Sequence, residues 1–425
     1  MINLTGWVSK VKSNEHFIGL EWLRFFLGFY LVMFHTFHYE AVPSWFRKFF
    51  DLGFFATSTF FILSGFLLAH VYLKNHTQSS VALREPPKSF FIKRFSNLYP
   101  IHIFSMLLII VIILIIPHLA IIDTDINYSI RSVTFDVNNG TPSADLKHYM
   151  DNSELILAFI MNFLMIQSWN PYYLMFNFPA WSISTLFFFY LVFPYIAPRL
   201  HKIKNPLKGL MTLNILYLIP VMLVILTTDF GTPETGILHR NPIIRLPEFM
   251  AGILLCSLYH KRKHIPLDKL TKFFMTLFII ASFVGAMYLL AIAPKLSDKG
   301  NIPYYILHDG LLLPAQACLI YLFANLKFSN NAKFVSISQK FGGASLPMFA
   351  LHIPIYMVFA RIERVLSGEP SLCFESFKAC FEAAGDKSLL SYPLFLFITI
   401  FLCILFQEKF VIKSRKFIQH LLLKN

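Results

Sequence analysis

Long apolar runs separated by short polar segments extend along almost the whole chain. A helix needs about 20 residues to cross a bilayer, and these runs are about that long. We therefore predict an all-α fold, a polytopic transmembrane helical bundle of about ten spans. The expected spans are 17–37, 52–73, 98–121, 180–197, 209–227, 242–259, 271–293, 304–325, 341–360 and 389–407.

A further apolar run at 154–168, "ELILAFIMNFLMIQS", is too short for a comfortable span. If it crossed, the basic segments 198–208 and 260–270 would lie outside, although Lys and Arg favour cytoplasmic loops. We therefore expect an interfacial or re-entrant helix at 154–168, and we place both termini in the cytoplasm.

The composition excludes an ordinary soluble protein, because 56% of the 425 residues are hydrophobic and only 14% are charged. The net charge of +14 is explained mainly by basic loops on the cytoplasmic side. These basic residues are dispersed and form no recognisable nucleic-acid-binding module, so we expect the lipid bilayer and no nucleic acid as a partner. A basic rim of this kind could also attract anionic lipids or phosphorylated cofactors.

We divide the chain into a cytoplasmic N-terminal segment (1–16), a transmembrane domain (17–410) and a basic cytoplasmic tail (411–425). No small-residue cleavage site follows the first apolar run, so we expect a retained helix there. We find no soluble domain, P-loop or internal repeat. Nor do we expect an appended extracytoplasmic domain after the last span.

The five cysteines show no zinc-ligand spacing, and we expect no metal site. Cys256, Cys318 and Cys403 fall in or near spans, where cysteine packs as a small apolar residue. Cys373 and Cys380 lie in the predicted outside loop 361–388, where a disulfide is one of two alternatives in an oxidising compartment.

The first span, which contains "RFFLGFYLVMFH", carries an arginine and a histidine that are both costly in hydrocarbon. Arg24 and His35 are eleven residues apart, so they share a helix face and lie about 16 Å apart along its axis. Glu21 can neutralise Arg24 at i,i+3 spacing. Simple snorkelling and helix-to-helix hydrogen bonding are one explanation. The other is chemical: His35 is a general base, and Arg24 holds the phosphates of an acyl thioester cofactor.

The spacing Arg24-x10-His35 resembles the signature of the acyltransferase-3 family of integral-membrane acyltransferases. Five later segments resemble further family motifs in the same order: "FFILSGFLLAHVY" (60–72), "FIKRFSNLYPIHIF" (91–104), "WSISTLFFFYLVFP" (181–194), "RLPEFMAGILL" (245–255) and "GGASLPMFALHIP" (342–354). Members of that family have about ten spans and O-acetylate surface glycans and other hydroxyl acceptors.

The resemblance implies a membrane-bound O-acyltransferase, and we expect transfer of acetyl from acetyl-CoA to a sugar hydroxyl of a cell-envelope or surface glycan. The expected location is the bacterial cytoplasmic (inner) membrane. Two alternatives are a transporter or flippase of glycan or lipid precursors, and a catalytically inactive relative that acts as a scaffold. A transporter with paired halves would show an internal repeat, which this chain lacks. The acceptor and the oligomeric state are not specified by the sequence.

Two positions depart from the family pattern. Leu186 stands where the family usually has a glutamate, and Asn97 stands where a second arginine is common. The missing carboxylate removes a group that could orient an imidazole, so either Glu248 or Glu21 replaces it or activity is altered or lost.

Several other residues are candidates for supporting roles. Arg94 and Lys93 are either cytoplasmic anchors or further contacts to the donor phosphates. Arg245 and Glu248 form either a structural ion pair or part of the site. His352 either bonds a neighbouring helix or touches the acceptor, Trp181 is an interface anchor or a substrate contact, and Ser182 is a packing hydroxyl or a substrate contact.

Overall fold

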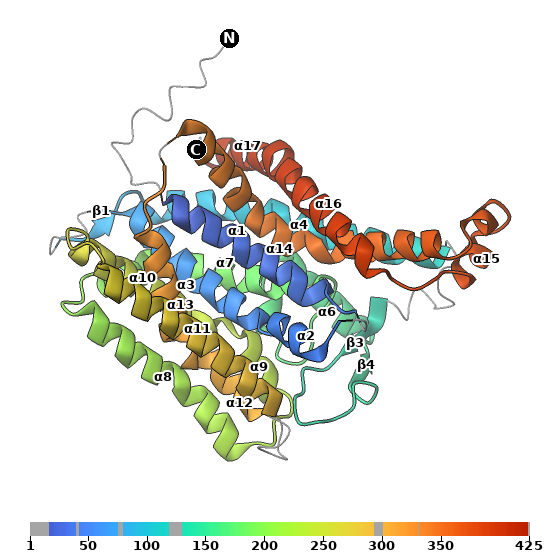
Figure 1. Cartoon of the computed structure of the whole chain (residues 1–425), viewed down its shortest axis with the longest axis horizontal. Helices are drawn as coiled ribbons and strands as arrows, with labels where there is room; N and C mark the ends of the chain where they lie inside the picture. Colours follow the sequence, from blue (N-terminus) through green and yellow to red (C-terminus); the bar gives the residue numbers. More distant parts are fainter. Residues whose placement is uncertain are drawn as a thin grey trace, which may run out of the picture.

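The computed structural model describes residues 17–39, 42–74, 80–118, 130–292, 301–329 and 331–423. The expected N-terminal segment 1–16 lies outside these residues. The main helices are α1 (Ile18–Thr36), α3 (Gly53–Tyr72), α4 (Pro87–His118), α7 (Trp181–His201), α8 (Pro206–Thr227), α10 (Pro242–Arg262), α11 (Lys269–Ile292), α13 (Leu313–Ala324), α14 (Ala332–Ser367), α16 (Tyr392–Phe406) and α17 (Ile412–Leu423) (Figure 1).

Five short helices and two small hairpins connect the main helices. The short helices are α2 (Ser44–Phe50), α6 (Asn152–Phe163), α9 (Glu234–Arg240), α12 (Ile302–Ile306) and α15 (Phe377–Glu382). The hairpins are antiparallel and pair β1 (Leu73–Lys74) with β2 (Ala82–Leu83), and β3 (Ser132–Thr134) with β4 (Lys147–Tyr149).

The predicted helical membrane protein is confirmed. Among the described residues, nine helices are long and apolar enough to cross a membrane, and a bent pair forms a possible tenth span. The bent pair covers the expected span 304–325. Its first part, Ile302–Leu311, consists of α12 and a distorted turn after it, and it meets α13 at 43°. Gly310 in this turn has φ of +134°, which residues with a side chain rarely adopt. Asn214 donates a hydrogen bond to the freed Gly310 carbonyl at 3.0 Å, which satisfies a main-chain group inside the bundle.

The predicted short helix at 154–168 corresponds to α6, whose 12 residues are too few to cross a membrane. Its N-terminus is fixed by a capping box, in which Asp151 accepts from the Glu154 amide and Glu154 accepts from the Asp151 amide. α4 and α14 are longer than their expected spans 98–121 and 341–360 because each helix continues into more polar sequence.

α3 lies at the centre of the bundle and α11 at its edge. In the most apolar window of each helix, 83% of the residues are buried in α3 and only 6% in α11. α3 packs closely on α10, because a Cβ at Gly65 would collide with the Phe249 carbonyl oxygen and a Cβ at Gly252 with the Ile62 carbonyl oxygen. Small residues at such a contact allow the two helix backbones to touch.

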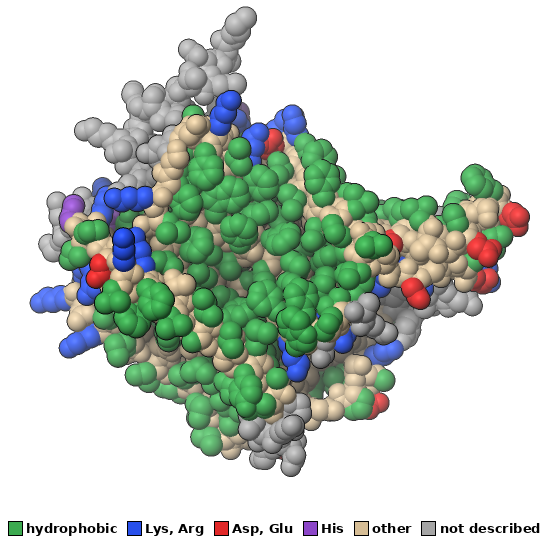
Figure 2. Space-filling model, viewed as in Figure 1, with side chains coloured by type: hydrophobic (Ala, Val, Ile, Leu, Met, Phe, Trp, Pro, Cys, Tyr) green, Lys and Arg blue, Asp and Glu red, His purple; other side chains and the backbone are tan. Residues whose placement is uncertain are grey.

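The surface pattern fits a protein that sits in a bilayer. On the face drawn in Figure 2, hydrophobic side chains cover the middle. Most Lys and Arg side chains on this face lie at its left and upper edges, and acidic side chains gather at the right. This separation of charge is the pattern that the positive-inside tendency produces. The orientation of the termini remains a prediction.

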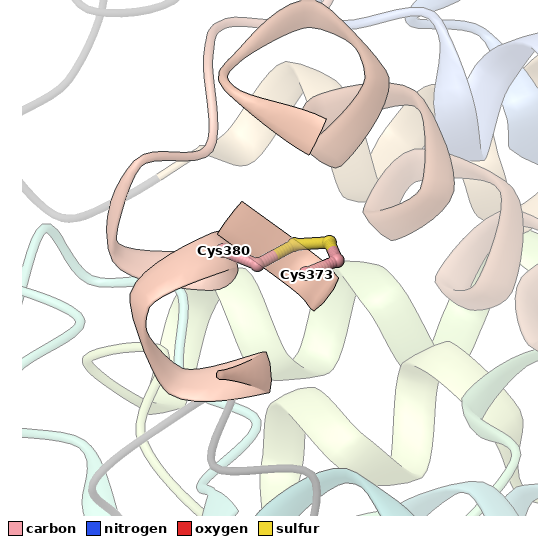
Figure 3. Close-up of a disulfide and its surroundings, with 2 residues drawn as sticks. All are labelled: Cys373 and Cys380. Carbon is pink, nitrogen blue, oxygen red and sulfur yellow. A yellow bond between two sulfur atoms is a disulfide. The ribbon is translucent and has the colours of Figure 1, made fainter. Parts of the chain in front are cut away.

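The segment between α14 and α16 contains a disulfide between Cys373 and Cys380 (Figure 3). The bond joins α15 to the short 3-10 helix before it, with the two Cα atoms 4.7 Å apart. Cys256, Cys318 and Cys403 are free. The structure thus contains the disulfide that the sequence left as one of two alternatives.

The expected tail at 411–425 forms helix α17 over its described part and packs along α4 (Figure 1). The Gln419 amide donates to the Ser96 hydroxyl at 3.0 Å, so the tail is attached to the bundle.

Candidate active site

One face of α1 carries Arg24, Gly28 and His35, at intervals of four and seven residues. Gly28 lies against α14, where a Cβ would be 3.4 Å from the Cα of Ser345. This contact brings α1 against α14 at a point between Arg24 and His35. The sequence prediction that the two ionisable residues share a face is therefore correct, and α14 is the helix that they meet.

His35 and His352 lie together where α1 packs on α14. Their ring centroids are 4.9 Å apart. Each Nδ1 is 2.9 Å from the main-chain oxygen four residues earlier, that of Leu31 for His35 and that of Met348 for His352. Because a carbonyl oxygen only accepts, Nδ1 carries the proton in both neutral rings, and each Nε2 keeps a lone pair. The buried Nε2 of His352 has no hydrogen-bond partner among the described residues.

A small cavity of about 30 Å³ lies at the same depth as Gly28. It has an apolar wall of aromatic and leucine side chains with three hydroxyl groups. Its lining residues are Thr57, Phe60, Phe61, Ser182, Leu186, Ser345, Leu346 and Phe349. Leu186, which replaces the glutamate usual in the family, thus faces this space. Phe349 connects the cavity to the histidine pair, because its ring centroid is 6.3 Å from that of His352.

Arg24 lies near the start of α1 and donates to the Glu21 carboxylate at 3.2 Å. The Arg24 side chain remains 29% exposed, so its remaining donors can reach a ligand. Gly342 of α14 makes room for Glu21, since a Cβ there would collide with Glu21 Oε2. The pairing predicted between Glu21 and Arg24 is confirmed, and it leaves Glu21 engaged away from the histidine pair.

Arg94 donates to the hydroxyl of Tyr72 and stacks over its ring at 4.8 Å. Its buried Nε has no partner among the described residues and is available for a further bond. The charges of Arg24 and Arg94 both reach the phenol of Tyr190 on α7, and we refer to these two arginines as the basic cluster. Lys93 instead pairs with Glu85, which supports its anchoring role.

Arg415 of α17 lies within range of the charge of Arg94. Nothing in the sequence singles out Arg415, because it lies in the tail among several other basic residues. Asn97, the position where the family commonly has a second arginine, follows Arg94 by three residues on the same face of α4.

Arg245 and Glu248 are fully buried and form an ion pair at 2.7 Å. Arg245 also donates to Asp309 at 2.9 Å and to Ser58 at 2.7 Å. A further bond runs to the His308 carbonyl at 3.2 Å, within the break between α12 and α13. Arg245 thus pairs with two carboxylates and ties the broken helix to α3 and α10, as buried charges require. Glu248 is engaged with Arg245 through Oε1, and its buried Oε2 has no hydrogen-bond partner among the described residues.

Trp181 is only 8% exposed, which excludes the role of a lipid-facing interface anchor. Its ring packs 6.0 Å from Phe61 and 5.1 Å from His239, between centroids. The Ser182 hydroxyl donates to the Pro179 carbonyl and lines the cavity.

A second imidazole site next to Trp181 was missed by the sequence analysis. His239 Nδ1 lies 2.9 Å from Asp136 Oδ2, and Arg240 pairs with the same carboxylate. Burial alone would raise the pKa of Asp136, but the charges and hydrogen bonds of His239 and Arg240 outweigh it and lower this pKa to about 2. The contact joins residues 103 apart in sequence, so no local motif could have revealed it.

The family model of an acyltransferase domain matches residues 17–408, which is nearly the whole chain. An uncharacterized protein of Haemophilus influenzae is 24% identical in an alignment of 221 residues that covers 49% of this chain and 77% of that protein. The acyltransferase MdmB of Streptomyces mycarofaciens is 29% identical over 146 residues, 34% of this chain and only 28% of its own length. No solved structure matches.

Proposed function

Since this chain belongs to the acyltransferase-3 family, we propose that it is a membrane-bound O-acyltransferase that moves an acetyl group from acetyl-CoA to a sugar hydroxyl of a cell-envelope or surface glycan. The observation that carries the proposal is the α1 face, where a basic cluster and a histidine pair lie about 16 Å apart with a small cavity between them. The proposed location is the bacterial inner membrane.

The basic cluster suits the phosphates of the donor. Arg24 and Arg94 each retain donors, and guanidinium groups bind phosphates with charge-assisted hydrogen bonds. The donor would enter with its phosphates at this cluster and extend its thioester along α1 towards His35. The cavity of about 30 Å³ suits a short acyl group, which favours acetyl over longer chains.

His35 acts as the general base in this proposal. Its Nδ1–H bond to Leu31 directs the lone pair of Nε2 away from the α1 backbone. Nε2 accepts the proton of the acceptor hydroxyl while the hydroxyl oxygen attacks the thioester carbonyl. The C–S bond then breaks, and the CoA thiolate leaves. His352 positions His35 by packing against its ring, in the absence of a glutamate at position 186.

The test is acetyl transfer from radiolabelled acetyl-CoA by purified protein in lipid, with extracted envelope glycans as acceptors. We expect label in the glycan with the wild type and a loss of about 10²–10⁴-fold in His35→Gln, the usual contribution of a general base. His420→Gln is the matched control, because His420 is exposed on α17. Equal activity of His35→Gln and wild type would exclude His35 as the base. If the wild type shows no turnover with any acceptor, the inactive scaffold is favoured. If glycan crosses the membrane without turnover of acetyl-CoA, the transporter is favoured.

A further inference from the structure

Two histidines and a cysteine gather at the end of the α3–α10 pair. His70 lies in the last turn of α3, and Cys256 and His260 lie one turn apart on α10. His70 Nδ1 is 3.1 Å from His260 Nε2, and the ligand atoms of the three side chains all lie within 4.8 Å of one another. Cys256 is fully buried and His70 is 6% exposed.

The helix packing explains why these side chains meet. Gly252, Cys256 and His260 follow one another at i,i+4 spacing, so they form one stripe along α10. Gly252 touches the backbone of α3 at Ile62, which turns the whole stripe towards α3. His70 extends α3 past that contact and faces the end of the stripe.

We propose that His70, Cys256 and His260 bind a Zn²⁺-class metal ion. One thiolate and two imidazoles are a borderline-soft donor set that suits Zn²⁺. In a tetrahedral zinc site, bond lengths of about 2.0–2.3 Å place the ligand atoms roughly 3.3–3.7 Å apart. The longest distance between two ligand atoms in the cluster therefore has to shorten by about 1 Å when the metal binds. Rotations of the side chains provide this change. Binding releases the thiol proton of Cys256 to solvent.

A fourth ligand is available beside the cluster. The ring of His201, at the end of α7, lies 6.1 Å from that of His260 between centroids. The Ser257 hydroxyl donates to the His201 carbonyl at 2.9 Å, which holds this end of α7 against α10. Either His201 or a water molecule completes the tetrahedron.

The ion would join the ends of α3 and α10. The last turn of α3 carries His70 and also Tyr72, whose hydroxyl accepts from Arg94. A metal at His70 would therefore hold this last turn of α3 against α10. A simple hydrogen-bonded histidine pair would hold the same helices without selecting a metal, and metal content separates the two.

The experiment measures metal bound by the full chain, purified without a histidine tag. Elemental analysis after equilibration with Zn²⁺ and removal of free metal should give about one zinc per chain. Co²⁺ substitution should give the intense visible bands of a tetrahedral ion and a thiolate-to-cobalt charge-transfer band. Cys256→Ser and His260→Gln should lose the stoichiometric metal, and Cys256→Ser also the charge-transfer band. Cys403→Ser, which removes another buried free cysteine, should keep both.

A second measurement covers variants that fold poorly. Zn²⁺ should raise the Tm of the wild type and of Cys403→Ser but not that of His70→Gln. His201→Gln distinguishes the fourth ligand, since weaker zinc binding assigns His201 and unchanged binding assigns water. The proposal is overturned if the wild type binds less than one zinc per chain under saturating Zn²⁺, or if Cys256→Ser binds as much as the wild type.

Discussion

Leu186 is one of the residues that line the small cavity, and its side chain limits the size of that cavity. We predict that Leu186→Ala raises the preference for butyryl-CoA over acetyl-CoA about tenfold or more, because each methylene group accommodated contributes about 1–3 kcal/mol. The variant should also lose about 2–4 kcal/mol of stability as a large-to-small core change. Relative kcat/KM for the two donors measures the first effect.

The control for this change is Leu191→Ala, which shortens an exposed leucine on the same helix. It should leave the donor preference unchanged. If Leu186→Ala alters turnover of both donors equally, the cavity does not hold the acyl chain.

Arg24 and Arg94 should act on the phosphates of the donor and not on its thioester. We predict that Arg24→Gln and Arg94→Gln each raise the KM for acetyl-CoA about 10–100-fold, as expected for loss of a charged hydrogen bond. With acetyl N-acetylcysteamine, a thioester without phosphates, the same variants should match the wild type. Arg199→Gln, an exposed arginine of α7, serves as control. Equal losses with both donors would place the arginines outside the donor site.

Contacts between individual residues were predictable from the sequence where both partners lie on the same helix. The Glu21–Arg24 pair and the shared face of Arg24 and His35 follow from helical periodicity. The contacts of His239 with Asp136 and of His70 with Cys256 and His260 join separate helices or loops, so spacing could not reveal them. The expectation of no metal rested on cysteine spacing alone, which cannot register a site built from one cysteine and two histidines.

At the scale of helices, the contact of α3 with α10 depends on Gly252. We predict that Gly252→Ala destabilises the protein by about 3 kcal/mol or more, the upper end for an overpacked core, because the added methyl group collides with main-chain atoms of α3 that cannot rotate away. Gly285→Ala on α11 is the matched control, since its Cβ would meet no atom within 4 Å. Helix propensity should make that change neutral or stabilising by up to about 1 kcal/mol. Thermal unfolding in lipid nanodiscs compares the two, and equal Tm values would contradict the close contact.

The link from the loop after β3 to α9 depends on the charge of Asp136. Because folding lowers the pKa of this carboxyl from about 3.9 to about 2, its contribution is fully present above pH 4 and is lost as the pH falls towards 2. The shift of nearly two units corresponds to about 2.5 kcal/mol. We predict that Asp136→Asn has a lower Tm than the wild type at pH 6 and that the difference shrinks by pH 3. A difference independent of pH would show that the charge of Asp136 is not the source.

The positions of the helices followed from hydropathy because each span must bury about 20 apolar residues in lipid. The break between α12 and α13 was not predictable from hydropathy. Its charged residue, Asp309, pairs with Arg245 of α10, a helix that is distant in sequence. The full lengths of α4 and α14 were also missed, because hydropathy measures the apolar part of a helix and not the polar turns beyond it.

At the scale of the whole molecule, the oxidation state of the cysteines should differ between the two sides of the membrane. We predict three free thiols per chain in denatured, unreduced protein from intact membranes, and five after reduction. Mass-shift alkylation counts them. Cys373→Ser should raise the unreduced count to four. Five thiols before reduction would mean that loop 361–388 does not reach an oxidising compartment.

Formation of the disulfide also depends on the insertion of the chain into the membrane. Under the proposed orientation, Cys373 and Cys380 meet an oxidant only after the segment between α14 and α16 has been translocated. The oxidised fraction of newly synthesised chains therefore cannot exceed the fraction whose last helical hairpin is already inserted. The oxidised fraction of pulse-labelled protein, trapped with an alkylating agent at successive times, would therefore report the progress of membrane insertion. This measurement needs no enzymatic assay.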